Sequence, residues 1–220
     1  MPMYKQYDIP VLTNDPNGIC EDQTTGAAGA LTLDGALVSG GIATAAAGQI
    51  VSIEGTGDNS GITFTITGLN SEGNTVPQVV TGENNGTAKS TTYFKTIDSI
   101  VASGAVTGNV EAGWLAADGM AGGALPLNLY QTPFNISLFF DLTAGTMTLS
   151  AQYTADDPFA TYASGFATEA KWWEVTGLSA VTADAVSNIA FPVRAVRFVQ
   201  TIGSATGTAT VTAIQGDTGA

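Results

Sequence analysis

The sequence contains no histidine and only one cysteine among its 220 residues. Without histidine, Ser-His-Asp and Cys-His nucleophilic arrangements are excluded, as is every zinc site that needs an imidazole ligand. The single cysteine, Cys20, cannot form an internal disulfide or a thiolate cage for a metal, which suits assembly in a reducing cytoplasm. These two absences remove the commonest hydrolase and zinc-site chemistries.

Basic residues are also scarce, with six Lys and Arg against nineteen Asp and Glu and a formal net charge of −13. Such a field repels phosphate backbones, so we expect no nucleic-acid partner. No apolar run approaches the length needed to span a bilayer, and the first residues lack the apolar core of a signal peptide. We therefore expect no membrane partner and synthesis in the cytoplasm of the host.

Carboxylates are the remaining candidates for catalysis, because no phosphate-cradling glycine motif occurs either. Asp156-Asp157 or Glu169 with Glu174 would resemble a glycosidase pair, but Asp-Asp-Pro is also a typical turn opener. The oxygen-rich loop of residues 57–60 offers calcium ligands without the spacing of a dedicated calcium loop. We predict no enzymatic activity, no cofactor and no metal.

The residues that are abundant favour short strands and tight turns. Hydrophobic residues make up 44% of the chain, charged residues 11%, and there are 27 glycines. Residues 62–67, ITFTIT, alternate apolar and threonine side chains, the pattern of a half-buried strand, and Gly- and Asn-rich loops flank them. Residues 134–140 and 147–153 predict a second hairpin, and residues 208–214 predict a last strand. The chain is expected to be all-β.

Two segments of the sequence nearly repeat. Thr206-Gly207 lies 99 residues after Thr107-Gly108, and the apolar and basic positions of 94–100 recur in 193–199. Residues 51–66 recur at an offset of 85 residues, which leaves a 14-residue insertion in the second copy. We predict two tandem antiparallel β-sandwich (jelly-roll-like) domains related by internal duplication, with a single larger sandwich as the alternative. The expected divisions are an extended N-terminal arm (1–26), a first domain (27–116), a Gly/Ala-rich linker (117–126) and a second domain (127–220).

The insertion, residues 156–175, is aromatic and gives the candidate interface. Adjacent residues of a strand point to opposite faces, so Trp172 and Trp173 cannot both enter one core. One of them is expected under a loop, between the copies or in a subunit interface, where aromatic side chains concentrate binding energy. The alternative is a loop folded over its own sheet. The interface candidates are Trp172, Trp173, Phe159, Tyr162 and Phe166.

Arg194 and Arg197 are two of the six bases and lie in a predicted strand. We expect at least one of them to hold Asp156 or Asp157 through a bidentate contact that fixes the insertion to the sheet. This expectation rests on the scarcity of positive charge in an acidic chain.

Short strand and turn motifs of the chain resemble those of virion structural proteins of tailed bacteriophages. The resemblance covers most of the chain after residue 50 and is carried by residues 62–68, 93–100, 107–113, 153–158, 192–197 and 211–215. It implies a capsid decoration (cement) protein that sits on the capsid exterior as a homotrimer, binds the major capsid protein and carries no catalytic residues. The arm would then act as a clamp on the capsid or a neighbouring subunit.

Two other functions remain open. The same β modules suit a tail, collar or host-attachment protein whose loops touch a receptor. A carbohydrate-binding β-sandwich, or a carbohydrate-active enzyme built on one, would use Trp172 or Trp173 as the platform for a sugar.

Overall fold

The computed structural model describes residues 3–159, 170–202 and 207–216. Within these residues the protein is all-β, with a single 3-10 helix, η1 (Ala116–Asp118). The chain forms two compact units, one of which is discontinuous. We call residues 12–120 the insert unit, and residues 1–11 together with 121–220 the split unit. This corrects the predicted tandem order, because the insert unit interrupts the sequence of the split unit.

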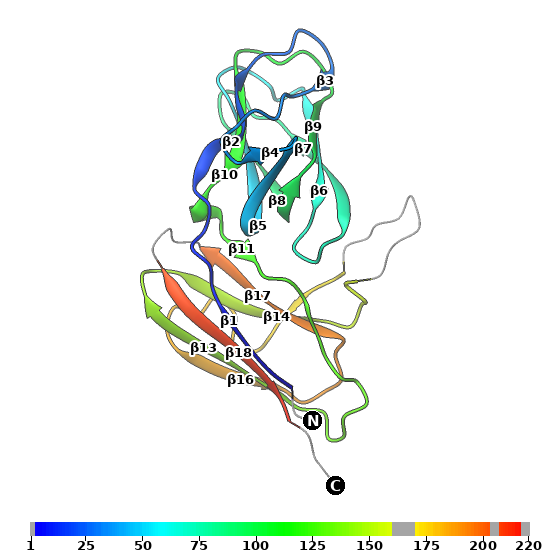
Figure 1. Cartoon of the computed structure of the whole chain (residues 1–220), viewed down its shortest axis with the longest axis vertical. Coiled ribbons are helices and arrows are strands. Elements are labelled where there is room, and N and C mark those ends of the chain that lie inside the picture. Colours follow the sequence, from blue (N-terminus) through cyan, green and yellow to red (C-terminus); the bar gives the residue numbers. More distant parts are fainter. Residues whose placement is uncertain (1–2, 160–169, 203–206, 217–220) are drawn as a thin grey trace. The chain divides into compact units, whose positions relative to one another are not determined.

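The insert unit is a sandwich of two antiparallel sheets (Figure 1). One sheet has the strand order β2-β10-β5-β8, and β4 (Val38–Ser39) adds a short hairpin to β5. The other has the order β3-β9-β6-β7. The strands of the insert unit's two sheets are β2 (Asp15–Gln23), β3 (Gly29–Ala30), β5 (Ile42–Gly55), β6 (Thr63–Leu69), β7 (Thr75–Thr81), β8 (Thr87–Ile97), β9 (Ser99–Ala102) and β10 (Val110–Trp114).

The split unit is also a sandwich of two antiparallel sheets. One has the order β1-β18-β13-β16, and the other the order β12-β17-β14-β15. The strands of the split unit's two sheets are β1 (Met3–Asp8), β12 (Leu125–Pro126), β13 (Ile136–Ala144), β14 (Thr148–Thr154), β15 (Trp173–Glu174), β16 (Ala185–Ile189), β17 (Ala195–Ile202) and β18 (Thr208–Gln215). The short strand β11 (Met120–Ala121) lies where the chain passes from the insert unit to the split unit.

Both units have the same topology. When the eight strands of each unit are counted in sequence order, one sheet reads 1-8-3-6 and the other 2-7-4-5, which is the strand order of a jelly roll. The ladders do not share one residue offset, however. Phe64 pairs with Ala102, whereas Leu149, the predicted equivalent of Phe64, pairs with Gln200 and not with Thr201. Duplication of one ancestral sequence therefore stays a prediction.

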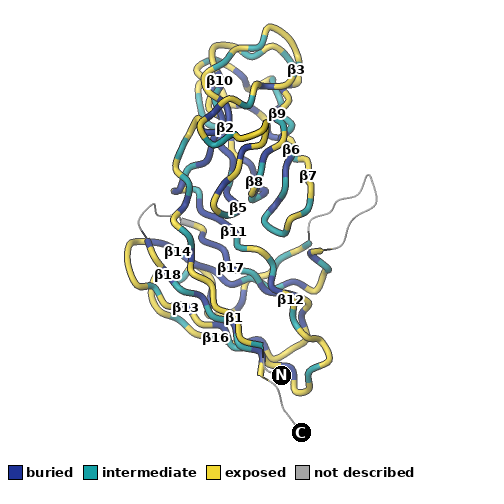
Figure 2. Tube along the Cα trace, in the orientation of Figure 1, coloured by how far each residue is buried: buried dark blue, intermediate teal, exposed yellow. Residues whose placement is uncertain are grey.

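Alternating apolar side chains fill the space between the two sheets of each unit. In β6 the residues Phe64 and Ile66 point inward and are fully buried, while the intervening threonines are partly exposed. Figure 2 shows the same alternation of buried and exposed positions along the strands of both units. The largest buried side chains of the insert unit include Phe64, Phe94 and Trp114. In the split unit, Phe140 of β13 packs edge-on against Phe198 of β17, with the ring centroids 5.7 Å apart.

Side-chain amides substitute for missing strand pairs in both units. In the insert unit the buried Gln49 accepts a hydrogen bond from the Thr13 N–H and donates one to the Thr13 carbonyl, both at 2.9 Å. Gln215 makes the same two bonds with Asn128 in the split unit, again at 2.9 Å. Asn59 clamps the backbone of Thr107 in this way at 2.8 and 3.1 Å. Each amide satisfies one N–H and one C=O that an extended segment would otherwise leave unpaired.

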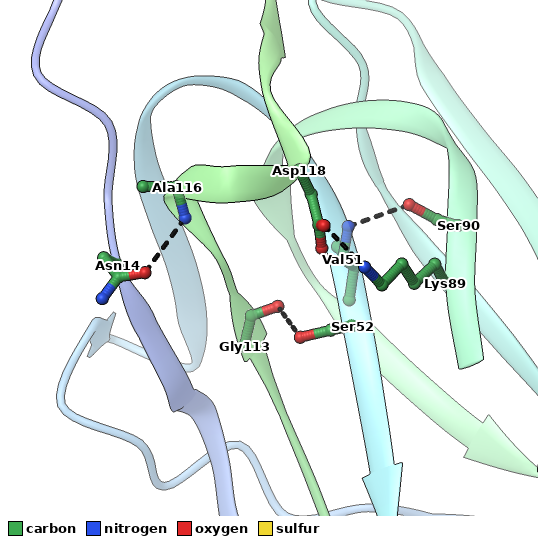
Figure 3. Close-up of polar contacts among 8 residues, drawn as sticks. All are labelled: Asn14, Val51, Ser52, Lys89, Ser90, Gly113, Ala116 and Asp118. Atoms are coloured by element: carbon green, nitrogen blue, oxygen red, sulfur yellow. Dashed lines mark hydrogen bonds and ion pairs between the residues drawn. The ribbon is translucent and has the colours of Figure 1, made fainter. Parts of the chain in front are cut away.

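One end of the insert unit is fixed by a set of polar contacts (Figure 3). The Asn14 side chain accepts a hydrogen bond from the Ala116 N–H at 3.1 Å, and Ser90 accepts one from the Val51 N–H at 2.9 Å. Lys89 on β8 lies 2.6 Å from the Asp118 carboxylate of η1, whose side chain is largely buried. These bonds attach η1 and the start of β2 to the central strands.

The predicted N-terminal arm is not an arm. Residues 3–8 form β1, which pairs with β18 in the split unit, and residues 15–23 form β2 in the insert unit. Figure 1 shows β1 and β18 side by side. The sequence hides β1 because it is an edge strand whose side chains are nearly all exposed, so it needs no apolar alternation.

The predicted linker also contains structure. Residues 117–126 include part of η1, the strand β11 and the strand β12, and β12 pairs with β17. The Gly122 N–H donates a 2.8 Å hydrogen bond to the Phe198 carbonyl. Small residues suit this stretch because a backbone that approaches another strand closely leaves little room for side chains.

Candidate functional site

The candidate site is an aromatic cluster at the edge of the β12-β17-β14-β15 sheet in the split unit. The register pairs Tyr153 with Trp173, so both rings lie on the same face of the sheet. They stack with centroids 6.0 Å apart and an interplanar angle of 22°, and Phe191 meets Tyr153 edge-on at 5.3 Å. Trp173 is 37% exposed and Phe191 49% exposed. Three rings are thus in contact, and two of them, Trp173 and Phe191, are accessible to solvent.

A row of polar side chains crosses the opposite face of the same strands. Gln152 pairs with Glu174 on one side and with Arg197 on the other. Its amide donates to a Glu174 carboxylate oxygen at 2.8 Å and accepts from Arg197 Nε at 2.9 Å. The guanidinium carbon of Arg197 lies 4.3 Å from the centre of the Trp172 ring, within the range of a cation–π contact. The two tryptophan side chains therefore lie on opposite faces of the sheet, as expected for adjacent residues of an extended chain.

Charged groups fix the start of the insertion. Arg194 Nη1 lies 3.2 Å from Asp157 Oδ2, and Asp157 also accepts a hydrogen bond from the Phe159 N–H at 3.0 Å. Asp156 accepts a 2.8 Å hydrogen bond from the Lys171 N–H at the other end of the insertion. Because the Arg194 and Asp157 side chains are about half exposed, the ion pair contributes little stability, about 0–1 kcal/mol. Its effect is to hold the start of the insertion against the segment before β17, while the Asp156–Lys171 hydrogen bond joins the two ends of the insertion.

Most of the predicted site residues lie near one another, but they form separate groups of contacts. Arg194 holds Asp157, whereas Arg197 binds the Gln152 side chain and faces Trp172. Phe159, near the start of the insertion, is exposed. Two of the interface candidates, Tyr162 and Phe166, lie outside the described residues.

Sequence reasoning missed three members of the cluster. Tyr153 ends the alternating strand before the insertion, Phe191 precedes β17, and Lys171 places its ammonium 5.3 Å from the centre of the Trp173 ring. The position of Tyr153 was an available signal. A large aromatic residue near the end of the strand before an insertion lies close to both ends of that insertion. Nothing in the sequence indicated that Phe191 would meet Tyr153.

The other predicted candidates are engaged in local structure. In the loop of residues 57–60, Asp58 accepts hydrogen bonds from the Ser60 N–H and hydroxyl, which lower the pKa of its carboxyl. Burial, with a smaller contribution from the Asp34 charge, raises the pKa of the Cys20 thiol to about 12, so the thiolate nucleophile is not available at neutral pH.

A row of carboxylates lies on the outer face of the β2-β10-β5-β8 sheet of the insert unit. Glu111 and Glu54 are directly opposite each other on β10 and β5. The pKa of Glu111 is raised above its usual value by partial burial first, and then by the charges of Asp22, Glu54 and Asp15. The row concentrates negative charge at one end of this sheet face.

The described residues contain no group of three or more Cys, Asp or Glu side chains placed to hold a metal ion. No helix in this part of the chain is long and apolar enough to cross a membrane. The aromatic cluster offers ring faces for stacking and a cation–π contact, and the opposite face of its strands offers hydrogen bonds. No family model, no curated protein and no solved structure matches this chain.

Proposed function

We propose that this chain is a non-catalytic structural protein of a tailed-bacteriophage virion, a capsid decoration protein that binds the outer shell and stabilises the head. The observation that carries the proposal is the fold: both units have jelly-roll strand order, an architecture that recurs in viral capsid domains. The phage-like strand and turn motifs of the sequence support it. The major capsid protein is the proposed partner, and the trimer is the proposed assembly.

The proposed mechanism is stabilisation by selective binding. A protein that binds the assembled shell but not its separated subunits stabilises the shell by mass action, and a trimer multiplies weak contacts through effective concentration. The exposed rings of Trp173 and Phe191 are the proposed contact with the shell, because rigid aromatic side chains contribute much of the energy at interfaces. Arg197 contacts Gln152 and Trp172 on the opposite face of the same strands.

The test is co-sedimentation with expanded and unexpanded heads of the phage that encodes the chain. We expect binding to expanded heads at micromolar concentration and a rise in their melting temperature. The double substitution Trp173→Ala with Phe191→Ala should weaken binding by roughly tenfold or more. Tyr130→Ala is the matched control, because Tyr130 is 96% exposed in the same unit but outside the cluster. A chain that does not bind heads at micromolar concentration contradicts the proposal.

A second candidate function is carbohydrate binding, favoured by the exposed Trp173 ring stacked on Tyr153. Aromatic faces bind sugar rings, and jelly rolls also occur as lectin domains. Titration with a glycan panel, followed by tryptophan fluorescence, distinguishes the two functions. Binding of the chain to host cells without binding to heads would instead support a tail, collar or host-attachment role.

A further inference from the structure

The outer face of the β1-β18-β13-β16 sheet in the split unit exposes an apolar pair. Leu138 and Phe140 of β13 point into the core and are fully buried, so Phe139 between them points outward. Phe139 is 39% exposed, and Val186, its direct cross-strand neighbour on β16, is 63% exposed. The two side chains form a small contiguous apolar patch at the centre of an outer sheet face, where a partner surface could cover them.

The ladder register arranges the outer side chains of this face in three rows. The middle row contains Phe139 and Val186, with Thr212 and Gln6 on the neighbouring strands. The row at one end carries carboxylates: Asp8, Asp141 and, beside β13, Asp184, which accepts a 2.9 Å hydrogen bond from the Leu142 N–H. The row at the other end carries no charge, because its residues are Tyr4, Ile214, Ser137 and Asn188, of which all but Ile214 have hydroxyl or amide groups.

We propose that this face pairs with the same face of a second copy of the chain, about a two-fold axis that lies in the plane of the interface and runs along the middle row, perpendicular to the strands. This rotation places each Phe139 on the partner's Phe139 and each Val186 on the partner's Val186. It also turns the carboxylate row of one copy onto the uncharged row of the other. Asn188 then faces the partner's Asp184, and Ser137 faces the partner's Asp141, so hydrogen-bond donors meet carboxylate acceptors on both sides of the axis.

This self-complementarity identifies the occupant. The surface has acceptors at one end, donors at the other and apolar groups between them, which is the pattern that an isologous interface requires. A two-fold axis parallel to the strands would instead place carboxylate on carboxylate, so the orientation is fixed. Face-to-face packing of two sheets is also the way in which each unit already builds its own core.

The size of the face sets the strength of the contact. Three rows on four strands cover on the order of 400 Å² per copy, about half the roughly 800 Å² per partner of a standard interface. We therefore expect weak association that doubles the mass of the solution species at roughly 100 μM or above. The contact is independent of the proposed binding to a shell, because it uses strands other than those of the aromatic cluster.

The first experiment is sedimentation velocity of the full chain over a concentration series from micromolar to millimolar. We expect wild type to show a concentration-dependent doubling of mass that Phe139→Glu or Val186→Glu abolishes. Val79→Glu should not change the association, since Val79 is exposed on β7 in the insert unit. Unchanged thermal unfolding of each variant shows that its fold is intact. A wild type that stays undoubled to millimolar concentration, or a Phe139→Glu variant that associates like wild type, overturns the proposal.

The second experiment tests the two-fold geometry. Asn188→Asp places a carboxylate opposite the partner's Asp184 and should weaken association by about tenfold. Adding Asp184→Asn in the same chain restores a donor–acceptor pair and should return association to near the wild-type level, since the amide oxygen can still accept the hydrogen bond from the Leu142 N–H. Within one chain the two positions are two rows apart, about 13 Å, beyond the screening length of roughly 8 Å. Effects of the two substitutions that simply add, with no recovery in the double variant, overturn the assigned axis.

Discussion

The two units have the same strand order, but cross-strand pairs of side chains on their corresponding outer sheet faces differ. In the insert unit Glu54 lies opposite Glu111 on the β2-β10-β5-β8 sheet. On the corresponding β1-β18-β13-β16 sheet of the split unit, Phe139 lies opposite Val186. The inner rows are alike, because Ile53 pairs with Ala112 in one unit and Leu138 with Ala213 in the other. The inner rows therefore determine the framework, and the outer rows are free to differ in what they bind.

The two units also differ in net charge. The insert unit has eleven acidic and two basic residues, a net charge of −9, whereas the split unit has eight acidic and four basic residues, a net charge of −4. Three of the four bases of the split unit lie around the insertion: Lys171 over Trp173, Arg197 over Trp172 and Arg194 beside Asp157. We expect the split unit to carry the protein contacts and the insert unit to present an acidic surface.

The largest expected effect comes from removing residues 1–11. The deletion takes away β1 and the buried Ile9 and leaves the edge of β18 unpaired, so the split unit should lose a large share of the roughly 5–15 kcal/mol that stabilises a domain. The insert unit begins at Leu12 and should stay folded. Calorimetry should show that the transition of the split unit is lost and that of the insert unit is kept. Loss of both transitions would mean that the units do not fold separately.

A second effect tests whether the amide clamps have equal roles in the two units. Gln49→Leu and Gln215→Leu each remove two part-buried hydrogen bonds to one backbone N–H and one C=O, and each should destabilise its own unit by about 1–3 kcal/mol. Trp114 is the only tryptophan of the insert unit, so in a Trp172→Phe, Trp173→Phe background its fluorescence reports that unit alone. Gln215→Leu should leave that signal unchanged during denaturant unfolding, and Gln49→Leu should shift it to lower denaturant.

Arg197→Ala gives a smaller effect that is restricted to the split unit. It removes the cation–π contact with Trp172 and the hydrogen bond to Gln152, a loss of about 1–2 kcal/mol. Arg194→Ala is the matched control, because its ion pair with Asp157 is exposed and should cost less than about 1 kcal/mol. Both are measured by thermal unfolding of the full chain. If Arg197→Ala leaves thermal stability and assembly unchanged, the structural role assigned to this residue is wrong.

The smallest effect is a pH dependence confined to the insert unit. The folded-state pKa of Glu111 is raised, so the folded state binds this proton more tightly than the unfolded state does. Stability should therefore fall as the pH rises through the region above the usual value of 4.5. Glu111→Gln should remove this dependence and stabilise the unit at pH 7 by about 0.5 kcal/mol, as expected for relief of a like-charged cross-strand pair. A stability profile between pH 4 and 8 that is the same for both proteins would refute it.

Local patterns predicted the strands that are half buried. The alternation in residues 62–67 predicted β6, that in 147–153 predicted β14, and residues 208–214 matched β18 to within a residue. Each of these strands has one face in a core, and burial imposes the period of two that a sequence shows. The all-β class follows from the same signal.

What the sequence did not reveal depends on pairing between distant residues. Met3 pairs with Gln215, and no local pattern marks an edge strand whose partner is more than two hundred residues away. The discontinuity of the split unit follows from that one pairing and was missed with it. At the candidate site, the opposite placement of Trp172 and Trp173 followed from strand geometry, but the contact between Tyr153 and Phe191 arises only when the ends of β14 and β17 meet.

The pairing of β1 with β18 also determines the order in which the protein can fold during translation. Asp8 and its hydrogen-bond partner Thr210 are 202 positions apart, so β1 leaves the ribosome long before the strand that receives it. At about 5–20 residues per second, the wait is on the order of 10–40 s. All strands of the insert unit emerge during that interval, so we expect it to fold first. A nascent chain therefore exposes an unpaired edge strand until its last segment is made.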